Sequence, residues 1–140
     1  MSLRAYIVED SPVIRESLIE TLQEVAGVEI AGFAEGEDEG SRWLSHHAAQ
    51  WDLAIVDLFL KSGNGLGVVE ACSVRRPGQK VVVLTNYATN DIRERCVRLG
   101  ADAVFDKSHE LDALFEFCLT LGPRDNGEPG GSDSTFSQLS

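Results

Sequence analysis

The sequence predicts an α/β fold, a doubly wound (βα)5 three-layer sandwich around a parallel five-stranded sheet. Short aliphatic runs alternate with segments of helical periodicity from residue 1 to residue 121, as in domains that join parallel strands through helices. Two of the runs, LAIV at 53–56 and VVVL at 81–84, are entirely apolar, which is expected of strands buried on both faces of a sheet. Five strand–helix repeats account for this region.

The strands and the first helix have local signals that set their bounds. We predict strands at residues 3–8, 28–34, 53–56, 81–84 and 103–105. The first helix begins after Ser11–Pro12, because serine is a good N-cap and proline is favoured at the first helical position. Gly27 ends this helix. The apolar residues that recur at helical spacing along it are Ile14, Leu18, Leu22 and Val25.

Four further helices complete the repeats. We predict the second helix around 37–49 and the third helix around 66–76. Gly100 ends the fourth helix, and Ser108 is placed to cap the fifth. The apolar positions of the last two helices are Ile92, Cys96 and Leu99, and then Leu111, Leu114, Phe115 and Cys118. Right-handed crossovers give the flavodoxin-like strand order 2-1-3-4-5.

Composition and charge limit the class of protein. The 140 residues include 12 Lys and Arg against 23 Asp and Glu, a formal net charge of −11. Nucleic acid and anionic lipid bind clustered basic side chains, so we expect neither as a direct partner. No apolar run approaches the ~18 residues that a membrane-spanning helix needs. Cys72, Cys96 and Cys118 lack metal-ligand spacing and are expected to be reduced core thiols, which favours a cytoplasmic location.

The amino-acid composition of the chain changes near Leu121. Residues 122–140 are rich in Gly, Ser, Pro and Asp and contain few large apolar side chains. Such a segment cannot offset the entropy of ordering its backbone, which predicts a flexible tail. We therefore expect one domain at 1–121 and a tail at 122–140.

Polar residues follow the predicted strands at their carboxyl ends, where ligands bind in doubly wound folds. Glu9 and Asp10 follow the first strand, and Asp57 ends the third. Thr85 follows the fourth strand, and Lys107 follows the fifth. Taken singly, most of these are equally ordinary turn, strand or loop residues, but together they indicate one site. Clustered carboxylates suit Mg²⁺, and a carboxylate beside Mg²⁺ can attack a phosphoryl group to form an aspartyl phosphate.

Four segments, in family order, resemble the receiver domain of two-component response regulators. They are IVED at 7–10, LAIVDLFL at 53–60, VVVLTNY at 81–87 and GADAVFDK at 100–107, and the resemblance covers residues 3 to about 121. It implies that Asp57 is the phosphoacceptor and that Asp10 holds Mg²⁺ directly. Glu9 would hold the ion directly or through water, and the backbone carbonyl of Phe59 would be a further ligand.

The resemblance also implies a role in signalling. Thr85 matches the family's switching hydroxyl and Lys107 its phosphate-pairing lysine. A histidine kinase or a phosphotransfer protein would donate the phosphoryl group, and the domain itself would catalyse transfer and slow autodephosphorylation. It would thus be a phosphoacceptor regulatory domain and not an enzyme. Its output would be a downstream protein partner or a homodimer, bound through residues 89–121.

Four features depart from the family pattern. Three are local: Glu9 in place of the commoner Asp, Lys61–Ser62 in place of Pro–Gly, and Ser108 in place of proline after the lysine. The fourth is Val104, which stands where an aromatic rotamer switch is usual. Phe105 is adjacent, but strand alternation directs it to the opposite face. Tyr87 is therefore the candidate for gating the response.

Three alternatives stay open on the sequence. The chain could be the receiver fragment of a helix-turn-helix transcription regulator, with residues 122–140 as the linker. An aspartyl-phosphate hydrolase on a similar sheet would usually carry a second acid two residues after its nucleophile, where this sequence has Phe59. A pseudo-receiver scaffold would usually lack the acceptor, an acid or the lysine, and none is missing here.

Overall fold

The computed structural model describes residues 2–121 and has the predicted architecture. Five parallel strands form one sheet in the order β2-β1-β3-β4-β5. The strands are β1 (Arg4–Val8), β2 (Glu29–Ala34), β3 (Leu53–Val56), β4 (Lys80–Thr85) and β5 (Ala103–Asp106). The helices are α1 (Pro12–Ala26), α2 (Glu37–His46), α3 (Gly65–Ala71), α4 (Asn90–Leu99) and α5 (Leu111–Leu121), with a 3-10 turn at Ala48–Gln50. The predicted fold class and strand order are confirmed, whereas the predicted tail lies outside the described residues.

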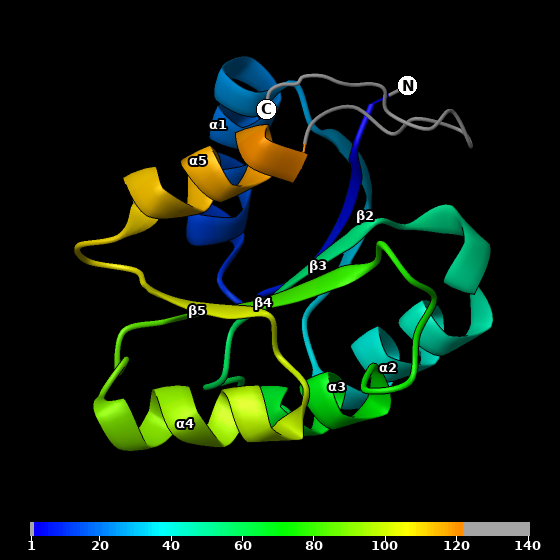
Figure 1. The fold of residues 1–140 in the computed structure, drawn as a ribbon, viewed down its shortest axis with the longest axis vertical. Helices are drawn as coiled ribbons and strands as arrows, with labels where there is room; N and C mark the ends of the chain where they lie inside the picture. Colours follow the sequence, from blue (N-terminus) through cyan, green and yellow to red (C-terminus); the bar gives the residue numbers. More distant parts are fainter. Residues whose placement is uncertain (1, 122–140) are drawn as a thin grey trace.

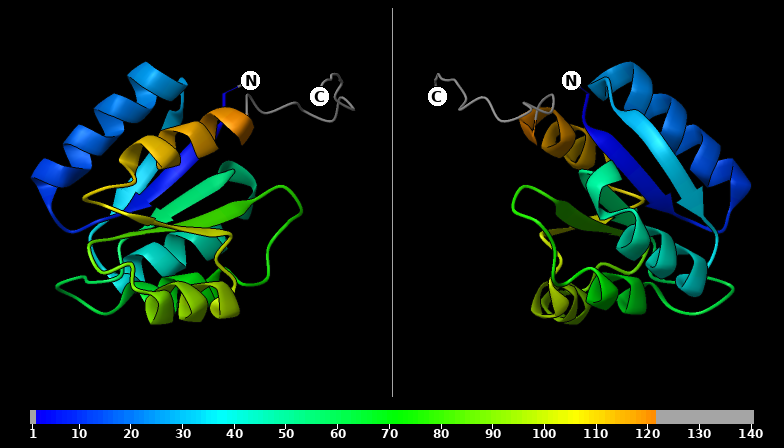
Figure 2. Two further views of the ribbon diagram at one scale, coloured as in Figure 1. Left: turned by 60° about the vertical axis from the view of Figure 1, so that its left-hand side comes forward. Right: turned by 90° about the vertical axis from the view of Figure 1, so that its right-hand side faces the viewer.

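Helices cover both faces of the sheet (Figure 1). Helices α1 and α5 lie together on one face, and α2, α3 and α4 lie on the other, as both views in Figure 2 also show. Each face has its own core: Leu22, Ile55 and Leu114 lie in the first, and Tyr6 and Val68 lie in the second. All four residues of β3 are buried, as the apolar run predicted.

Helix α1 starts and stops where the sequence predicted, but its buried face is turned. The Ser11 hydroxyl accepts a hydrogen bond from the Ile14 N–H, and Gly27 ends the helix with φ 63°. The buried residues of α1 are Arg15, Leu18 and Leu22. Ile14 and Val25, expected on the apolar face, are 40% and 54% exposed. The charged side chain of Arg15 is thus buried where apolar periodicity predicted the neighbouring Ile14.

Three helix bounds differ from the prediction. Helix α2 ends at His46, ahead of the 3-10 turn, and α3 ends at Ala71. After α3, the Arg75 guanidinium donates to the carbonyls of Cys72, Gln79 and Gly100 and fixes a loop there. Ser108 does not cap α5, which begins three residues later. The Ser108 N–H donates to the Asp106 carboxylate at 2.7 Å, in a turn between β5 and α5.

Two further expectations concern the thiols and membranes. The three cysteines are free and buried, as predicted for core residues. Within residues 2–121, no helix combines the length and the apolar character that crossing a bilayer requires.

Candidate functional site

The sheet register brings three carboxylates together. Strands β1 and β3 are neighbours with Val8 opposite Val56, so the residues that follow the two strands emerge side by side. Glu9, Asp10 and Asp57 each offer one oxygen, and these oxygens lie within 4.8 Å of one another. Glu9 and Asp57 are buried, and Asp10 is half-buried. Carboxylate oxygens at this separation fit Mg²⁺, which prefers oxygen ligands.

Lys107 supplies a positive charge to this cluster from the end of β5. Its Nζ donates to Glu9 Oε1 at 2.7 Å and to Asp57 Oδ2 at 3.0 Å. Burial raises the pKa of Glu9 and outweighs the hydrogen bonds that the carboxylate accepts from Lys107 and the Ser11 N–H. Burial alone would lower the pKa of Lys107, but its hydrogen bonds to the two acids outweigh burial and raise it. Lys107 therefore stays charged at neutral pH.

The loop between β3 and α3 orients two of the acids through its backbone. The Phe59 N–H donates to Asp57 Oδ1 at 3.4 Å, and the Lys61 N–H donates to Asp10 Oδ2 at 2.7 Å. This loop returns tightly at Gly65 onto the backbone that follows β3, and any side chain there would collide with the Asp57 carbonyl. A glycine eight residues after Asp57 thus lets the loop close around the acids.

Thr85 joins the site through the backbone. It is fully buried, its hydroxyl accepts a hydrogen bond from the Tyr87 N–H at 3.1 Å, and its carbonyl accepts one from the Lys107 N–H at 2.9 Å. Tyr87 itself is exposed, and its ring meets the Phe59 ring edge-on with centroids 5.1 Å apart. Two exposed aromatic side chains therefore stand two residues after Asp57 and Thr85.

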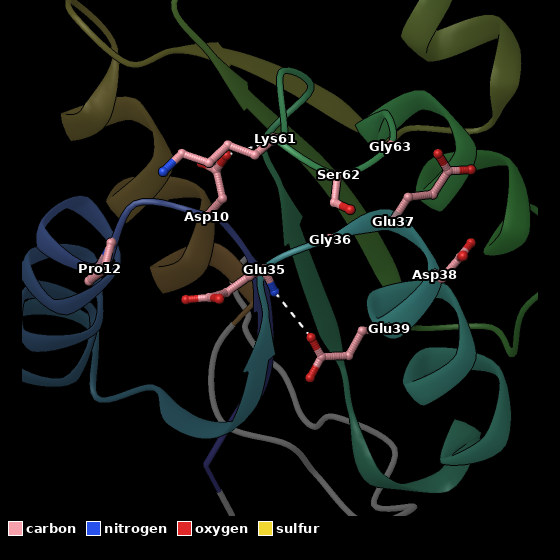
Figure 3. Close-up of a pocket in the computed structure, with 10 residues that line it drawn as sticks. All are labelled: Asp10, Pro12, Glu35, Gly36, Glu37, Asp38, Glu39, Lys61, Ser62 and Gly63. Carbon is pink, nitrogen blue, oxygen red and sulfur yellow. Dashed lines mark hydrogen bonds between the residues drawn. The ribbon is translucent and has the colours of Figure 1, made fainter.

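A hollow of about 600 Å³ opens beside the carboxylate cluster. Figure 3 shows Asp10 at its upper rim with Lys61, and the acids of the β2–α2 segment opposite. Most of these acids have partners of their own: Glu35 lies 3.2 Å from Arg15, and Glu37 accepts a hydrogen bond from the Asn64 N–H at 2.8 Å. Of the three clustered acids, only Asp10 lines this hollow.

Comparison with known families accounts for this arrangement. The family described as "Response regulator receiver domain" matches residues 5–118, nearly all of the described chain. This chain belongs to that family. Receiver domains are regulatory parts of bacterial two-component systems and bind Mg²⁺ at an acidic pocket. The acidic cluster at the ends of β1 and β3 has the composition that such a pocket needs.

Relatives of this receiver domain include a protein named as a phosphodiesterase and proteins named as regulators. A protein named cyclic di-GMP phosphodiesterase from Thermotoga maritima is 31% identical over 108 residues, which are 77% of this chain and 28% of the relative. The photosynthetic apparatus regulatory protein RegA of Rhodovulum sulfidophilum is 43% identical over 69 residues, 49% of this chain and 38% of the relative. The chain spans less than half the length of these curated relatives.

Solved structures share the fold. The DNA-binding response regulator of the LuxR family from Staphylococcus aureus has a TM-score of 0.74 at 18% identity, covering 85% of this chain and 98% of that chain. The response regulator domain of Thermotoga maritima CheB has a TM-score of 0.72 at 18% identity, covering 88% of this chain and all of that one. At these identities the likeness concerns the fold alone.

The departures from the receiver pattern have structural consequences. Val104 is buried in the core under α2–α4, whereas Phe105 packs with Phe117 on the opposite face, as strand alternation predicted. No aromatic side chain of β5 therefore faces α4 in the described part of the chain. The Arg93 guanidinium donates to the Val104 carbonyl at 2.8 Å. Every peptide bond between residues 2 and 121 is trans, including the one that joins Lys107 to Ser108.

Sequence reasoning missed a buried cation that touches the backbone of the site. Arg15 lies on α1, yet its guanidinium donates to the backbone carbonyl of Glu9 at 2.9 Å. The available signal is its spacing, since Arg15 stands three residues before Leu18 and seven before Leu22, on the face that packs inward. A charged residue at such a position usually has a buried partner.

Proposed function

We propose that this receiver domain is a phosphorylation-controlled switch whose phosphoacceptor is Asp57. The observation that carries the proposal is the position of its carboxylate, which is buried, 3.0 Å from the Lys107 ammonium and within 4.8 Å of Glu9 and Asp10. A nucleophilic oxygen, two further acids and a cation are thus gathered at one edge of the sheet, as phosphoryl transfer requires.

Mg²⁺ is the metal that this set of residues would hold. Glu9, Asp10 and Asp57 supply carboxylate oxygens, and we assign the Phe59 backbone carbonyl as a further ligand. Hard oxygen donors without nitrogen or sulfur suit Mg²⁺ better than Zn²⁺. When bound, the ion neutralises charge on the phosphoryl oxygens.

Each polar side chain has a part in the proposed transfer. An Asp57 oxygen forms a bond to phosphorus while the bond from phosphorus to the donor breaks, and the electron pair of that bond stays with the donor. Lys107 pairs with a phosphoryl oxygen, because its Nζ already lies beside Asp57. The Thr85 hydroxyl turns toward another oxygen and responds to its charge.

The partners and the output follow from this role. We propose a histidine kinase or a phosphotransfer protein as donor, action in the cytoplasm, and output through residues 89–121 to a protein partner or a second copy. We assign 1–121 as the receiver domain and 122–140 as a tail. One relative, from Mycobacterium tuberculosis, is named a DNA-binding transcriptional activator, and this chain spans 45% of it. That observation favours a receiver that serves a longer regulator, and the net charge of −11 argues against direct nucleic-acid contact by this chain.

Phosphorylation by a small donor tests the proposal. Incubated with acetyl phosphate and Mg²⁺, the protein should gain the mass of one phosphoryl group, and Asp57→Asn should gain none. Asp38→Asn is a matched control, because Asp38 is an exposed acid of the neighbouring hollow (Figure 3) and its replacement should leave labelling unchanged. Equal labelling of Asp57→Asn and the parent would assign the phosphoryl group to another residue and refute the proposal.

A further inference from the structure

Arg15 is a buried cation that the proposed transfer chemistry does not use. Its side chain is 9% exposed and makes three contacts outside its own helix. The guanidinium donates to the Glu9 carbonyl at 2.9 Å and to Glu35 Oε2 at 3.2 Å, and it lies 4.0 Å above the centre of the Phe33 ring. Arg15 therefore joins α1 to the end of β1 and to the end of β2.

The contact with Glu9 completes a set of restraints on that residue. The Glu9 N–H donates to the Ala34 carbonyl at 3.0 Å, and the two carboxylate oxygens accept from Lys107 and from the Ser11 N–H. Arg15 supplies the remaining restraint, on the carbonyl. That carbonyl belongs to the planar peptide group that also carries the Asp10 N–H. Holding the peptide plane thus fixes the position of the Asp10 N–Cα bond, from which the Asp10 side chain branches.

The chemistry of arginine suits this task. One guanidinium nitrogen, Nη1, donates both to the Glu9 carbonyl and to Glu35, and it belongs to a rigid plane, whereas a lysine ammonium is a point charge on a flexible stem. The Phe33 ring supports one face of the plane. The buried side chain is therefore held in a single arrangement before any ligand binds.

We infer that Arg15 is a positioning residue for metal capture: through the Glu9 carbonyl it sets the Glu9–Asp10 peptide, and so the two acids that receive Mg²⁺. This inference rests on the proposed function. It makes a prediction opposite to that of electrostatics alone. Removing a positive charge near a cation site should strengthen Mg²⁺ binding by Coulomb's law, whereas releasing a ligand-bearing peptide should weaken it.

The experiment compares Mg²⁺ binding by the parent, Arg15→Met and Arg76→Met, using calorimetric titration and amide chemical shifts. Arg15→Met should raise the dissociation constant roughly tenfold, a typical cost of losing a residue that orients metal ligands. Arg76→Met removes the same charge from an exposed residue before β4, at the opposite end of that strand from the site, and should leave the constant unchanged. The Mg²⁺ concentration for half-maximal labelling by acetyl phosphate should rise in parallel, with a smaller change in the maximal rate.

Two further variants separate positioning from folding. Glu35→Gln keeps the Glu9 contact and removes the ion pair, so its Mg²⁺ affinity should stay within about twofold of the parent. Arg15→Lys keeps the charge but not the planar donor, and its Mg²⁺ dissociation constant should lie between those of the parent and Arg15→Met. An Arg15→Met protein with the parent's or a tighter Mg²⁺ affinity would overturn the inference, as would a Glu35→Gln protein as impaired as Arg15→Met. A parent that binds Mg²⁺ but gains no phosphoryl group would refute the proposed function alone, whereas a parent that binds no Mg²⁺ would overturn both.

Discussion

Replacing Lys107 by methionine tests how far one buried cation holds the acidic site together. Its Nζ lies 2.7 Å from Glu9 and 3.0 Å from Asp57, and none of the three side chains is more than 10% exposed. Methionine keeps a similar length and removes the charge, so two buried carboxylates lose their shared partner. Removing one member of a buried ion pair costs about 3–5 kcal/mol, and we expect about 3 kcal/mol here because the half-buried Asp10 side of the site admits water. That loss corresponds to a melting temperature lower by roughly 10 °C.

The pH dependence of the loss has a defined sign. The folded-state pKa of Lys107 is raised, so its stabilising contribution is complete at neutral pH and is lost only as pH rises through that raised value. The folded-state pKa of Glu9 is also raised, so ionising this carboxylate opposes folding as pH rises through its pKa. In Lys107→Met, ionised Glu9 has lost its ammonium partner and destabilises the folded state more strongly. The difference in stability between the parent and Lys107→Met should therefore shrink as pH falls toward the range in which Glu9 gains a proton.

Thermal and urea unfolding in a metal chelator measure this difference, and added Mg²⁺ provides a second readout. Because Lys107 competes with a cation for Glu9 and Asp57, Mg²⁺ should stabilise the variant more than the parent. For Lys107→Met, the free energy of unfolding should rise by about 1.4 kcal/mol at a Mg²⁺ concentration ten times the variant's dissociation constant. Lys61→Met is the control, since it removes an exposed charge from the same edge and should change stability by less than about 0.5 kcal/mol. Equal stability of Lys107→Met and the parent at neutral pH without metal would refute the reasoning.

Three further perturbations have expected outcomes. Mg²⁺ affinity, followed by titration at decreasing pH, should fall at a higher pH than an ordinary glutamate would give, because Glu9 must lose its proton to bind and its pKa is raised. Burial and the nearby Glu39 raise the pKa of Tyr6 to about 12, so denaturant unfolding of the parent should show stability falling between about pH 10 and 12 more steeply than in Tyr6→Phe. Tyr87→Ala should retain phosphorylation but reduce the amide chemical-shift changes in residues 89–121; changes equal to the parent's would exclude a gating role.

The sheet and the acidic cluster could be predicted because both follow from local rules. Aliphatic runs define the strands, right-handed crossovers define their order, and adjacent strand ends must then lie together. Glu9 and Asp57 meet for this reason, one residue beyond the paired Val8 and Val56. Lys107 reaches the same edge from β5, as its position after the last strand predicted.

Features that depend on side-chain contacts between distant segments could not be predicted in the same way. Helical periodicity placed Ile14 on the buried face of α1, but the pairing of Arg15 with Glu9 and Glu35 sets the rotation of the helix. Serine is a common N-cap, yet Ser108 lies in a turn, where its N–H donates to the Asp106 carboxylate and its hydroxyl donates to the Asn86 side chain. In both cases the observed arrangement includes polar contacts between separate segments, which the hydrophobic pattern does not encode.

The contacts of Lys107 also set the direction in which the proposed switch responds. Its ammonium is divided between Glu9 and Asp57, and its backbone N–H donates to the Thr85 carbonyl. A phosphoryl group on Asp57 would replace the single carboxylate charge by about two negative charges on the phosphoryl oxygens, and it would draw the ammonium away from Glu9. Lys107 leads the turn into α5, and Arg93 joins that turn to α4 through Glu110 at 2.7 Å. Movement of the lysine can therefore reach both helices through hydrogen bonds, without an aromatic side chain in β5 that faces α4.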